Sequence, residues 1–596
     1  MSLVLEIWHV LTPRQRRWVL FAQAISIVMA FSTVAGIASI APFFSVLGNP
    51  GLVERSAVLR ELYRLGGFAS PRSFTVALGV AFMGLVLLAN LINLIGTFVL
   101  NRLALWIGTD LQSILFAEYV QRPYLFHART PSALLFNNVV NETVRATNQI
   151  LQNGFTLVTN IVTALFIIVS VTLLNPLIAT AMILALAGGY VLIYLGVRNR
   201  LLRAGQLQSR LFTEQTRIVN ETLGAIKEIL VLGNQEFFRR RFNSASHAFA
   251  RAVAQTQLIA QSPRFVMECV AVLGLVAVAL LSQSGEGGIG PSLGQLTFIG
   301  FAAYRLLPTL QQAFTAIVRI RADRPGFSSI ASDLNLARRR QLVRGAAQSA
   351  WLELPRSEIL LQDVSFRYEP DRPAALERVS VRIPARGVVG LVGANGSGKT
   401  TLVDLLAGLL VPEQGTVEVD GIRLTEDNRA AWQSRIAYVP QTVFLLNRTL
   451  AENIALGVPR AQIDGEQLRA VTQLAQLDEL IQTLPGGYDH VIGERGASLS
   501  GGQRQRVGIA RALYTEASVL ILDEATSALD GLTEQELLAT IARLRGTYTI
   551  VLIAHRLSTV RACDVIYQLE HGKVTGSGTY QGLLHESEMF RRLVSV

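Results

Sequence analysis

The stretch GVVGLVGANGSGKTTL, residues 387–402, decides the fold of the second half of the chain. An apolar run of strand type leads into a glycine-rich turn, and Lys399 and Thr400 then open a predicted helix. This order fits the phosphate-loop pattern: the glycines let backbone N–H groups turn toward a triphosphate, Lys399 reaches its phosphates, and the Thr400 hydroxyl is a Mg²⁺ ligand. We therefore predict an ATP and Mg²⁺ site formed by Gly393, Asn395, Gly396, Ser397, Gly398, Lys399, Thr400 and Thr401.

The apolar run VLILDE, residues 519–524, ends in two carboxylates. Strand ends beside a phosphate loop are where doubly wound sheets bind their ligands. Asp523 is suited to holding Mg²⁺, and Glu524 is placed to polarise the attacking water as a general base. The alternative interpretation is a strand that simply ends in charge.

A second phosphate-binding element is predicted at LSGGQ, residues 499–503, which opens the helical run RQRVGIARAL. A serine and two glycines at a helix N-terminus form a nest for an anion. One phosphate loop and one such nest in a chain suggest that each nucleotide lies between the loop of one copy and the nest of another. We therefore predict a homodimer whose ATP sites are completed by Ser500, Gly501, Gly502 and Gln503.

The first half of the chain has the composition of a membrane domain. The 596 residues are 50% hydrophobic and only 16% charged, against about a quarter charged in ordinary globular proteins. Long uncharged stretches exceed the ~20 residues that cross a bilayer, and Asn175 with Pro176 makes a turn within one of them. We predict a transmembrane domain at 1–325, a polar linker at 326–357 and an α/β domain at 358–596, with spans at 18–47, 74–101, 150–174, 177–197, 260–283 and 293–320.

Positive residues set the predicted orientation. The net charge is +11, and arginines concentrate in 102–145 and 198–251 and after the last span, whereas the turns near 175 and 283–292 carry none. Cytoplasmic loops hold the positive residues, so we predict an inner-membrane protein with both termini and the α/β domain in the cytoplasm. The apolar positions of both basic loops follow helical spacing, which predicts spans that continue as long helices beyond the bilayer. An anionic partner is the other explanation for the charge.

A short segment between the first two spans, residues 52–66, is amphipathic. Charged residues flank one apolar stripe formed by Val58, Leu59, Leu62, Tyr63 and Leu65. We predict a helix lying on the external membrane surface. A packed loop helix without a ligand role is the alternative.

At these motifs the chain resembles the ATP-binding cassette (ABC) transporters over essentially its whole length. The resemblance implies an exporter half-transporter: an all-α transmembrane domain of six helices (type I exporter, or type IV ABC, fold) followed by an α/β P-loop NTPase nucleotide-binding domain. It also implies coupling helices near 120–135 and 220–240, one docking on the chain's own nucleotide-binding domain and one on the partner's. The implied site residues are Tyr368 on adenine, Gln441 on Mg²⁺, Asp530 at the dimer interface and His555, a second catalytic residue, on the γ-phosphate.

Charged residues inside the spans are costly, so they point to function. Arg264 and Glu268 are four residues apart and share a helix face, and Arg305 lies at a similar depth in the sixth span. Two arginines against one glutamate leave positive charge, which predicts a substrate-binding cavity for an anionic headgroup. The alternative is structural pairing of Glu268 with Arg305, whose depths differ by roughly 5 Å at 1.5 Å per residue, with Arg264 reaching the cytoplasmic interface.

The patterns P-R-x-x-x-E in the fifth span and Y-R-L-x-P in the sixth, together with the external helix, are similar to those of the bacterial flippases for lipid-linked oligosaccharides of protein N-glycosylation. The resemblance implies that the arginines attract a pyrophosphate-oligosaccharide and that the external helix meets the polyprenyl tail. In the second span, Asn90 and Asn93 stand where such a flippase would carry another cation. We predict ATP-driven flipping of a polyprenyl-pyrophosphate glycan, or a similar anionic glycolipid, from the inner to the outer leaflet.

Three other functions stay open at this point. An exporter of lipophilic drugs, peptides or other lipids would be favoured by a cavity without intramembrane arginine. A soluble cassette ATPase that works on DNA or ribosomes is disfavoured by six spans, so we expect no nucleic-acid partner. A gated channel on the same scaffold is required by nothing in the sequence.

Overall fold

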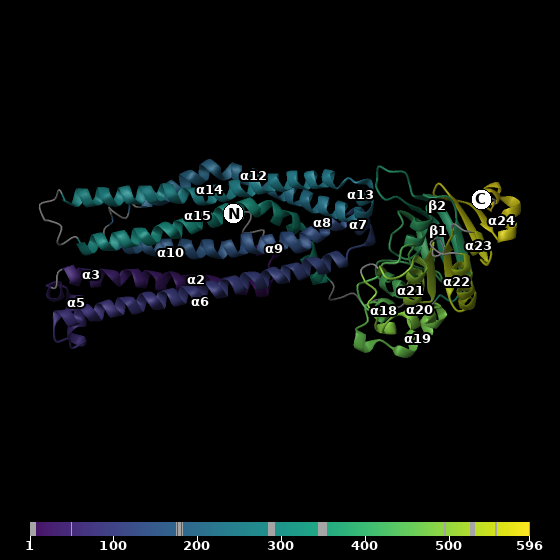
Figure 1. The fold of residues 1–596 in the computed structure, drawn as a ribbon, viewed down its shortest axis with the longest axis horizontal. Coiled ribbons are helices and arrows are strands. Elements are labelled where there is room, and N and C mark those ends of the chain that lie inside the picture. Colours follow the sequence, from purple (N-terminus) through teal and green to yellow (C-terminus); the bar gives the residue numbers. More distant parts are fainter. Residues whose placement is uncertain are drawn as a thin grey trace. The chain divides into compact units, whose positions relative to one another are not determined.

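The structure, a computed structural model, describes residues 8–48, 51–174, 176, 180, 183–283, 293–343, 355–493, 496–524, 531–554 and 557–594. Its contacts divide the chain into two compact units: Met1–Arg122 with Thr130–Arg344, and Pro123–Arg129 with Gly345–Val596. The described residues of the first unit form helices and their connections, and both sheets belong to the second (Figure 1). We call them the helical unit and the α/β unit.

Long helices make up most of the helical unit. Two of them begin as local sequence predicts: Pro13 and Pro71 each occupy the first helical position, behind the capping residues Thr12 and Ser70, where proline has no hydrogen bond to lose. The elements are α2 (Pro13–Ala38), α3 (Ile40–Gly48), α4 (Leu52–Arg55), α5 (Ala57–Leu65), α6 (Pro71–Val120), α8 (Ser132–Phe136), α9 (Thr143–Arg145), α10 (Gln152–Leu174), α12 (Gly188–Gly224), α13 (Ile226–Leu232), α14 (Gln235–Gln283) and α15 (Leu293–Val343), with π-helical turns η1 (Asn137–Glu142), η2 (Ala146–Leu151) and η3 (Ile183–Ala187).

Helices lie over the described parts of all six predicted spans. Among the described residues, three helical stretches are long and apolar enough to cross a membrane: Pro13–Leu47, Pro71–Val120 and Ser132–Leu173. The last three predicted spans fall on η3 with α12, on α14 and on α15. Asn175 of the predicted turn lies outside the described residues. Neighbouring helices run side by side, α2 beside α6 and α12 beside α14 (Figure 1).

Several helices extend far past the predicted spans. At 1.5 Å per residue, the 50 residues of α6 reach about 75 Å, much more than a ~30 Å hydrocarbon core. The predicted continuation of the spans as long helices is therefore confirmed.

The predicted linker at 326–357 differs from the structure, because α15 continues through Pro325 to Val343. Phe327, Ile330 and Leu334 recur at helical spacing beyond the proline and are buried. Asp333 accepts hydrogen bonds from Tyr119, at 2.8 Å, and from Arg122, at 2.7 Å. This packing offsets the ~3 kcal/mol cost of a proline inside a helix, so the helical unit extends to Arg344.

The α/β unit contains two sheets. Strands β1 (Glu358–Phe366), β2 (Leu376–Pro384), β4 (Gln414–Val419) and β5 (Ile422–Arg423) form an antiparallel sheet in the order β2-β1-β4-β5. The second sheet has the order β10-β9-β3-β8-β7-β6: β10 (Lys573–Gly578), β9 (Val565–Glu570), β3 (Val388–Val392), β8 (Thr549–Ile553), β7 (Val519–Asp523) and β6 (Ile436–Val439). Its strands are parallel except β10. Every residue of β3, β7 and β8 is buried, as expected for a parallel sheet covered on both faces.

Short helices surround these sheets. They are α7 (Tyr124–Arg129), α16 (Lys399–Leu406), α17 (Arg429–Gln433), α18 (Leu450–Ile454), α19 (Gly465–Leu474), α20 (Asp478–Thr483), α21 (Gly501–Tyr514), α22 (Gly531–Leu544), α23 (Leu557–Val560), α24 (Tyr580–Glu586) and α25 (Glu588–Val594). The predicted phosphate loop joins β3 to α16, and the predicted carboxylate pair ends β7, with β8 between these two strands. Parallel strands end at the same edge of a sheet, so the topology brings these two predicted elements to one edge.

Candidate functional site

The loop between β3 and α16 has a backbone that requires glycine. Gly398, directly before α16, has a φ of 102°, which L-residues with a side chain rarely adopt. A Cβ added at Gly393 would lie 2.2 Å from the carbonyl oxygen of Leu569. The close backbone approach and the left-handed turn curl the loop at the N-terminus of α16, where backbone N–H groups favour an anion.

Two side chains of the loop fit a phosphate ligand. Lys399 is buried, and its Nζ donates to the carbonyls of Gly393, at 2.9 Å, and Ala394, at 3.0 Å. Burial lowers the pKa of Lys399, while the nearby carboxylates Glu524 and Asp523 act in the opposite direction. The Ser397 hydroxyl is buried and has no hydrogen-bond partner among the described residues. A buried group without a partner costs free energy, and a phosphate oxygen would accept its hydrogen bond.

The end of β7 holds the two predicted acidic residues in distinct surroundings. Asp523 accepts a hydrogen bond from the Tyr438 hydroxyl at 2.9 Å. The Glu524 carboxylate accepts one from Gln441 Nε2 at 2.5 Å. Thr400, Gln441 and Asp523 offer the oxygen ligands that Mg²⁺ prefers, so these residues fit the predicted metal.

Glu524 has a strained backbone. Its φ is +48°, a left-handed conformation that costs roughly 1–2 kcal/mol for a residue with a side chain. The N–H of Glu524 donates to the carbonyl of Ile553 in β8, at 3.1 Å, and this bond holds the turn. Strain of this kind clusters at functional sites, which supports the role predicted for this carboxylate.

Tyr368 reaches the phosphate loop. Its hydroxyl lies 3.2 Å from Thr401 Oγ1, and its ring packs edge-on against Phe366 with 5.1 Å between the centroids. The carbonyl of Tyr368 accepts a hydrogen bond from Arg129 in α7, and Leu125 of α7 packs against the same apolar core. Residues 123–129 of the predicted coupling segment thus belong to the α/β unit, and the coupling role of the segment stays a prediction.

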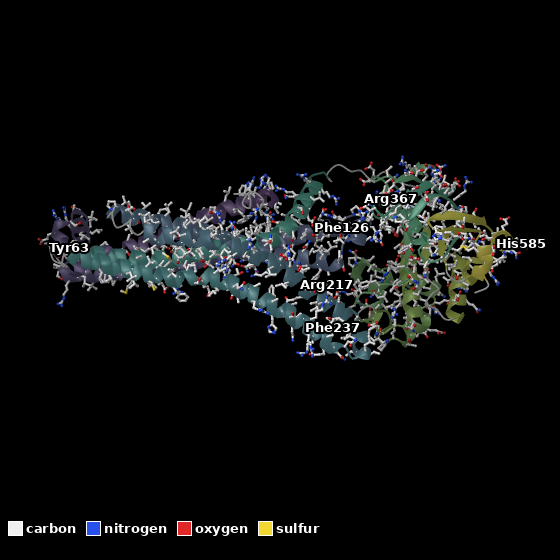
Figure 2. All side chains as sticks on the ribbon, turned by 90° about the horizontal axis from the view of Figure 1, so that it is seen from above. Tyr63, Phe126, Arg217, Phe237, Arg367 and His585 are labelled. Atoms are coloured by element: carbon white, nitrogen blue, oxygen red, sulfur yellow. The ribbon has the colours of Figure 1, made fainter. Side chains whose placement is uncertain are left out.

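The second predicted coupling segment, near 220–240, contains α13 and belongs to the helical unit. Leu230, Val231 and Leu232 are exposed there, as is Phe237 at the start of α14 (Figure 2). Exposed apolar groups of this kind mark an interaction surface.

The LSGGQ segment forms the predicted helix N-terminus. Ser500 caps α21: its hydroxyl accepts from the backbone N–H of Gln503 at 3.2 Å, and Gln503 Oε1 accepts from the Ser500 N–H at 2.8 Å. Ser500 is exposed, and Gly501 and Gly502 in the first turn are half-buried. The two other predicted residues, Asp530 and His555, lie outside the described residues.

Two residues of the phosphate site were not predicted. Asp404 is buried one turn after Thr400 on α16, and desolvation together with Asp523 raises its pKa to about 6. The i, i+4 spacing from Thr400 was a usable signal for it. No local sequence pattern marks Tyr438 as part of the site. Its place there depends on the strand order, which puts β6 beside β7 with Tyr438 opposite Ile521.

The three predicted substrate-binding residues line one cavity of about 630 Å³ in the helical unit. Arg264 Nε donates to Glu268 at 2.7 Å along one face of α14. Glu268 therefore pairs with Arg264, its neighbour one turn away on the same helix, and not with Arg305 as the structural alternative expected. Among the residues that the structure describes, the Arg305 guanidinium has no ion-pair partner.

The amphipathic segment is two helices, α4 and α5, separated at Ser56. Leu59 and Tyr63 pack on the cluster of Val46, Val53 and Phe74, and Tyr63 lies at one end of the helical unit (Figure 2). Val58, Leu62 and Leu65 are exposed. Two of the five residues of the predicted apolar stripe thus pack against the chain, and three stay available to a membrane or ligand.

Comparison with known proteins agrees with this architecture. The family models "ABC transporter transmembrane region" and "ABC transporter" match residues 17–305 and 376–527. The chain is 31% identical to the ATP-dependent lipid A-core flippase of Ralstonia nicotianae, over 86% of each chain. It is 30% identical to that of Nitrosococcus oceani, over 96% of this chain and 92% of the relative.

Its fold is similar to that of a solved structure, a bacterial Atm1-family ABC exporter with ATP bound. The TM-score is 0.77 at 25% identity, covering 95% of this chain and 98% of that one. The phosphate loop, the carboxylate pair at the end of β7 and helix α21, which Ser500 caps, lie in one α/β unit. Most of this unit follows the helical unit in the chain. The chain therefore belongs to the ABC transporter family, as an exporter half-transporter in which a transmembrane domain precedes a nucleotide-binding domain that couples ATP hydrolysis to transport.

Proposed function

We propose that the protein flips a lipid-linked anionic glycan, of the polyprenyl-pyrophosphate oligosaccharide class, from the inner to the outer leaflet of the cell's inner membrane. The observation that carries the proposal is the arginine in the membrane cavity: Arg305 lines it without an ion-pair partner in the described chain, beside the Arg264–Glu268 pair. A cation inside a membrane is costly unless something neutralises it, and an anionic headgroup would do so. Relatives named as lipid A-core flippases support a lipid as the transported molecule.

The nucleotide-binding domain would supply the energy through residues of this chain. ATP with Mg²⁺, when bound, provides the phosphoanhydride and neutralises its charge. Lys399 would hold the phosphates, and Thr400, Gln441 and Asp523 would hold the cation. Glu524 accepts the proton of the attacking water, because its strained turn keeps the carboxylate at the strand end. Asp530 and His555 are assigned by family resemblance to the dimer interface and the γ-phosphate.

Two copies are needed for this scheme. Ser500 caps a helix N-terminus at the surface, where it would grip the nucleotide held by the loop of the second copy. Exposed apolar residues on α13 would dock on that copy's nucleotide-binding domain. Two ATP molecules would close the homodimer and open the membrane cavity outward, and hydrolysis would reset it. The termini and both nucleotide-binding domains would be cytoplasmic, with six spans per chain.

The test is reconstitution of the full-length protein in lipid vesicles. ATP-dependent flipping is measured for a polyprenyl-pyrophosphate oligosaccharide, for lipid A-core and for an uncharged lipophilic drug. The proposal expects the polyprenyl glycan to be flipped fastest. Transport of the drug alone would establish the drug-exporter alternative instead.

A further inference from the structure

A second cavity of the helical unit differs in chemistry from the one that holds Arg264 and Glu268. It measures about 420 Å³ and lies among α2, α6, α10 and α15, within the size range of small-molecule sites. Among its described lining residues, Arg305 alone is charged. Much of its wall is formed by hydroxyl and amide side chains, among them Thr33, Asn93, Asn101, Gln152, Asn160 and Gln312.

Hydrogen bonds to the helix backbone fix how two of the amides are turned. Asn93 Nδ2 donates to the Ala89 carbonyl at 2.9 Å, and Asn160 Nδ2 donates to the Thr156 carbonyl at 2.8 Å. A carbonyl can only accept, so the nitrogen of each amide must face the backbone. The amide oxygens of Asn93 and Asn160 remain as acceptors, and within the described chain neither receives a hydrogen bond.

Two further amides of the lining bond to each other and leave one donor and one acceptor open. Gln152 Nε2 donates to Asn101 Oδ1 at 2.9 Å, so the Asn101 nitrogen and the Gln152 oxygen have no partner in the described part of the chain. The cavity wall thus offers both acceptors and donors, and only one charge.

This composition suits sugar hydroxyls. An O–H group donates and accepts at once, which matches amide oxygens beside amide nitrogens and threonine hydroxyls. An apolar tail would leave the amide oxygens of Asn93, Asn160 and Gln152 unpaired inside a membrane domain, which is unfavourable. A phosphate calls for cations, and among the described residues of this lining Arg305 is the single one.

The two cavities share Arg305, Pro308 and Gln312 of α15. A ligand could therefore place its phosphate at Arg305 and extend its uncharged part into the amide-lined space. We infer that the cavity among α2, α6, α10 and α15 is a subsite for the neutral sugar residues of the headgroup, with Arg305 at its junction with the phosphate position. This inference rests on the proposed function, since it names the part of the headgroup that the amides recognise.

The test compares two lipid probes on the reconstituted full-length protein. Undecaprenyl pyrophosphate and the same lipid carrying an uncharged oligosaccharide are titrated, and stimulation of ATP hydrolysis gives a half-saturating concentration for each. The double variant Asn93→Leu/Asn160→Leu should raise this concentration about tenfold or more for the glycosylated probe, since each hydrogen bond contributes a factor of about five. It should leave the value for the bare pyrophosphate unchanged.

Asn90→Leu is the matched control. Asn90 lies on the same helix and donates to the Val86 carbonyl at 2.8 Å in the same way, but it does not line the cavity. It should shift neither probe. Should the double variant fold poorly, Thr97→Val removes a lining hydroxyl while keeping the side-chain shape, and it should weaken only the glycosylated probe, by about fivefold.

The outcomes separate the two ideas. If the variants weaken both probes equally, or leave the glycosylated probe unaffected, the sugar subsite is refuted while the flippase proposal stands. If the wild-type protein responds to neither probe, the proposed function falls, and the subsite falls with it.

Discussion

The phosphate site and the membrane cavities are built in opposite ways. The phosphate site depends on short contiguous segments whose backbone sets the geometry, such as the loop that ends at Gly398 and the turn at Glu524. The amide-lined cavity depends on side chains of four helices, from Thr33 on α2 to Gln312 on α15. A contiguous site tolerates little change in sequence and carries general chemistry, whereas a dispersed one can change residue by residue and set specificity.

The largest effect is expected at the contiguous site. Glu524→Gln keeps the shape of the side chain but removes the general base, so ATP turnover should fall by about 10²- to 10⁴-fold. ATP binding should persist, because Lys399 and the loop are unchanged. Nucleotide binding and steady-state hydrolysis are measured on the same preparation. The control is Glu466→Gln, which changes an exposed residue in the first turn of α19. Normal ATP turnover in the Glu524→Gln variant would disprove the assignment of Glu524 as the general base.

The same contrast explains how far the sequence could predict the molecule. The phosphate loop, the carboxylate pair and the helix cap of Ser500 were predictable because each depends on neighbours within a few residues. The shared helix face of Arg264 and Glu268 was predictable from their i, i+4 spacing, but the pairing of Glu268 with Arg264 rather than with Arg305 was not. The end of the helical unit was misjudged because burial of Phe327, Ile330 and Leu334 carries α15 past Pro325.

The amide-lined cavity could not be predicted at all. Asn93 and Asn160 lie on different helices, and each alone reads as a polar residue that bonds to its own helix backbone. Only the packing of α6 against α10 and α15 shows that they share a wall with Arg305. Side-chain sites that depend on long-range packing leave no local sequence pattern.

The next-largest effect is expected at Arg305, which lines both cavities. Arg305→Ala should raise the half-saturating concentration of both lipid probes by about tenfold or more, since a charge-assisted hydrogen bond contributes roughly 1.5–3 kcal/mol. Hydrolysis without lipid should change little. Arg305→Lys should recover part of the response because it restores the charge. Equal loss of basal and lipid-stimulated hydrolysis would instead assign Arg305 to the fold.

A smaller effect tests the buried carboxyl beside the phosphate loop. The pKa of Asp404 is about 6, above the ordinary 3.8, because burial and Asp523 disfavour its charge. The protonated form is thus favoured in the folded state, and stability is lost as the pH rises from about 4 through 6. Asp404→Asn should stabilise the nucleotide-free protein by about 2–3 kcal/mol at pH 7.5 and by much less at pH 4.5. Thermal unfolding at both pH values measures this difference, with Asp427→Asn at an exposed position as the control. A gain in stability that does not depend on pH would contradict the prediction.

The smallest effect distinguishes a structural pair from a functional one in the charged cavity. The side chains of Arg264 and Glu268 are 61% and 41% exposed in the structure, and they form an ion pair at 2.7 Å. If the net charge of the cavity attracts the headgroup, Glu268→Gln should tighten the response to undecaprenyl pyrophosphate about two- to fivefold. Arg264→Gln should weaken the same response by a similar factor. If the pair only holds α14 in place, removing either partner should shift the half-saturating concentration of undecaprenyl pyrophosphate in the same direction. Shifts in opposite directions for the two variants would favour a cavity whose charge acts on the substrate.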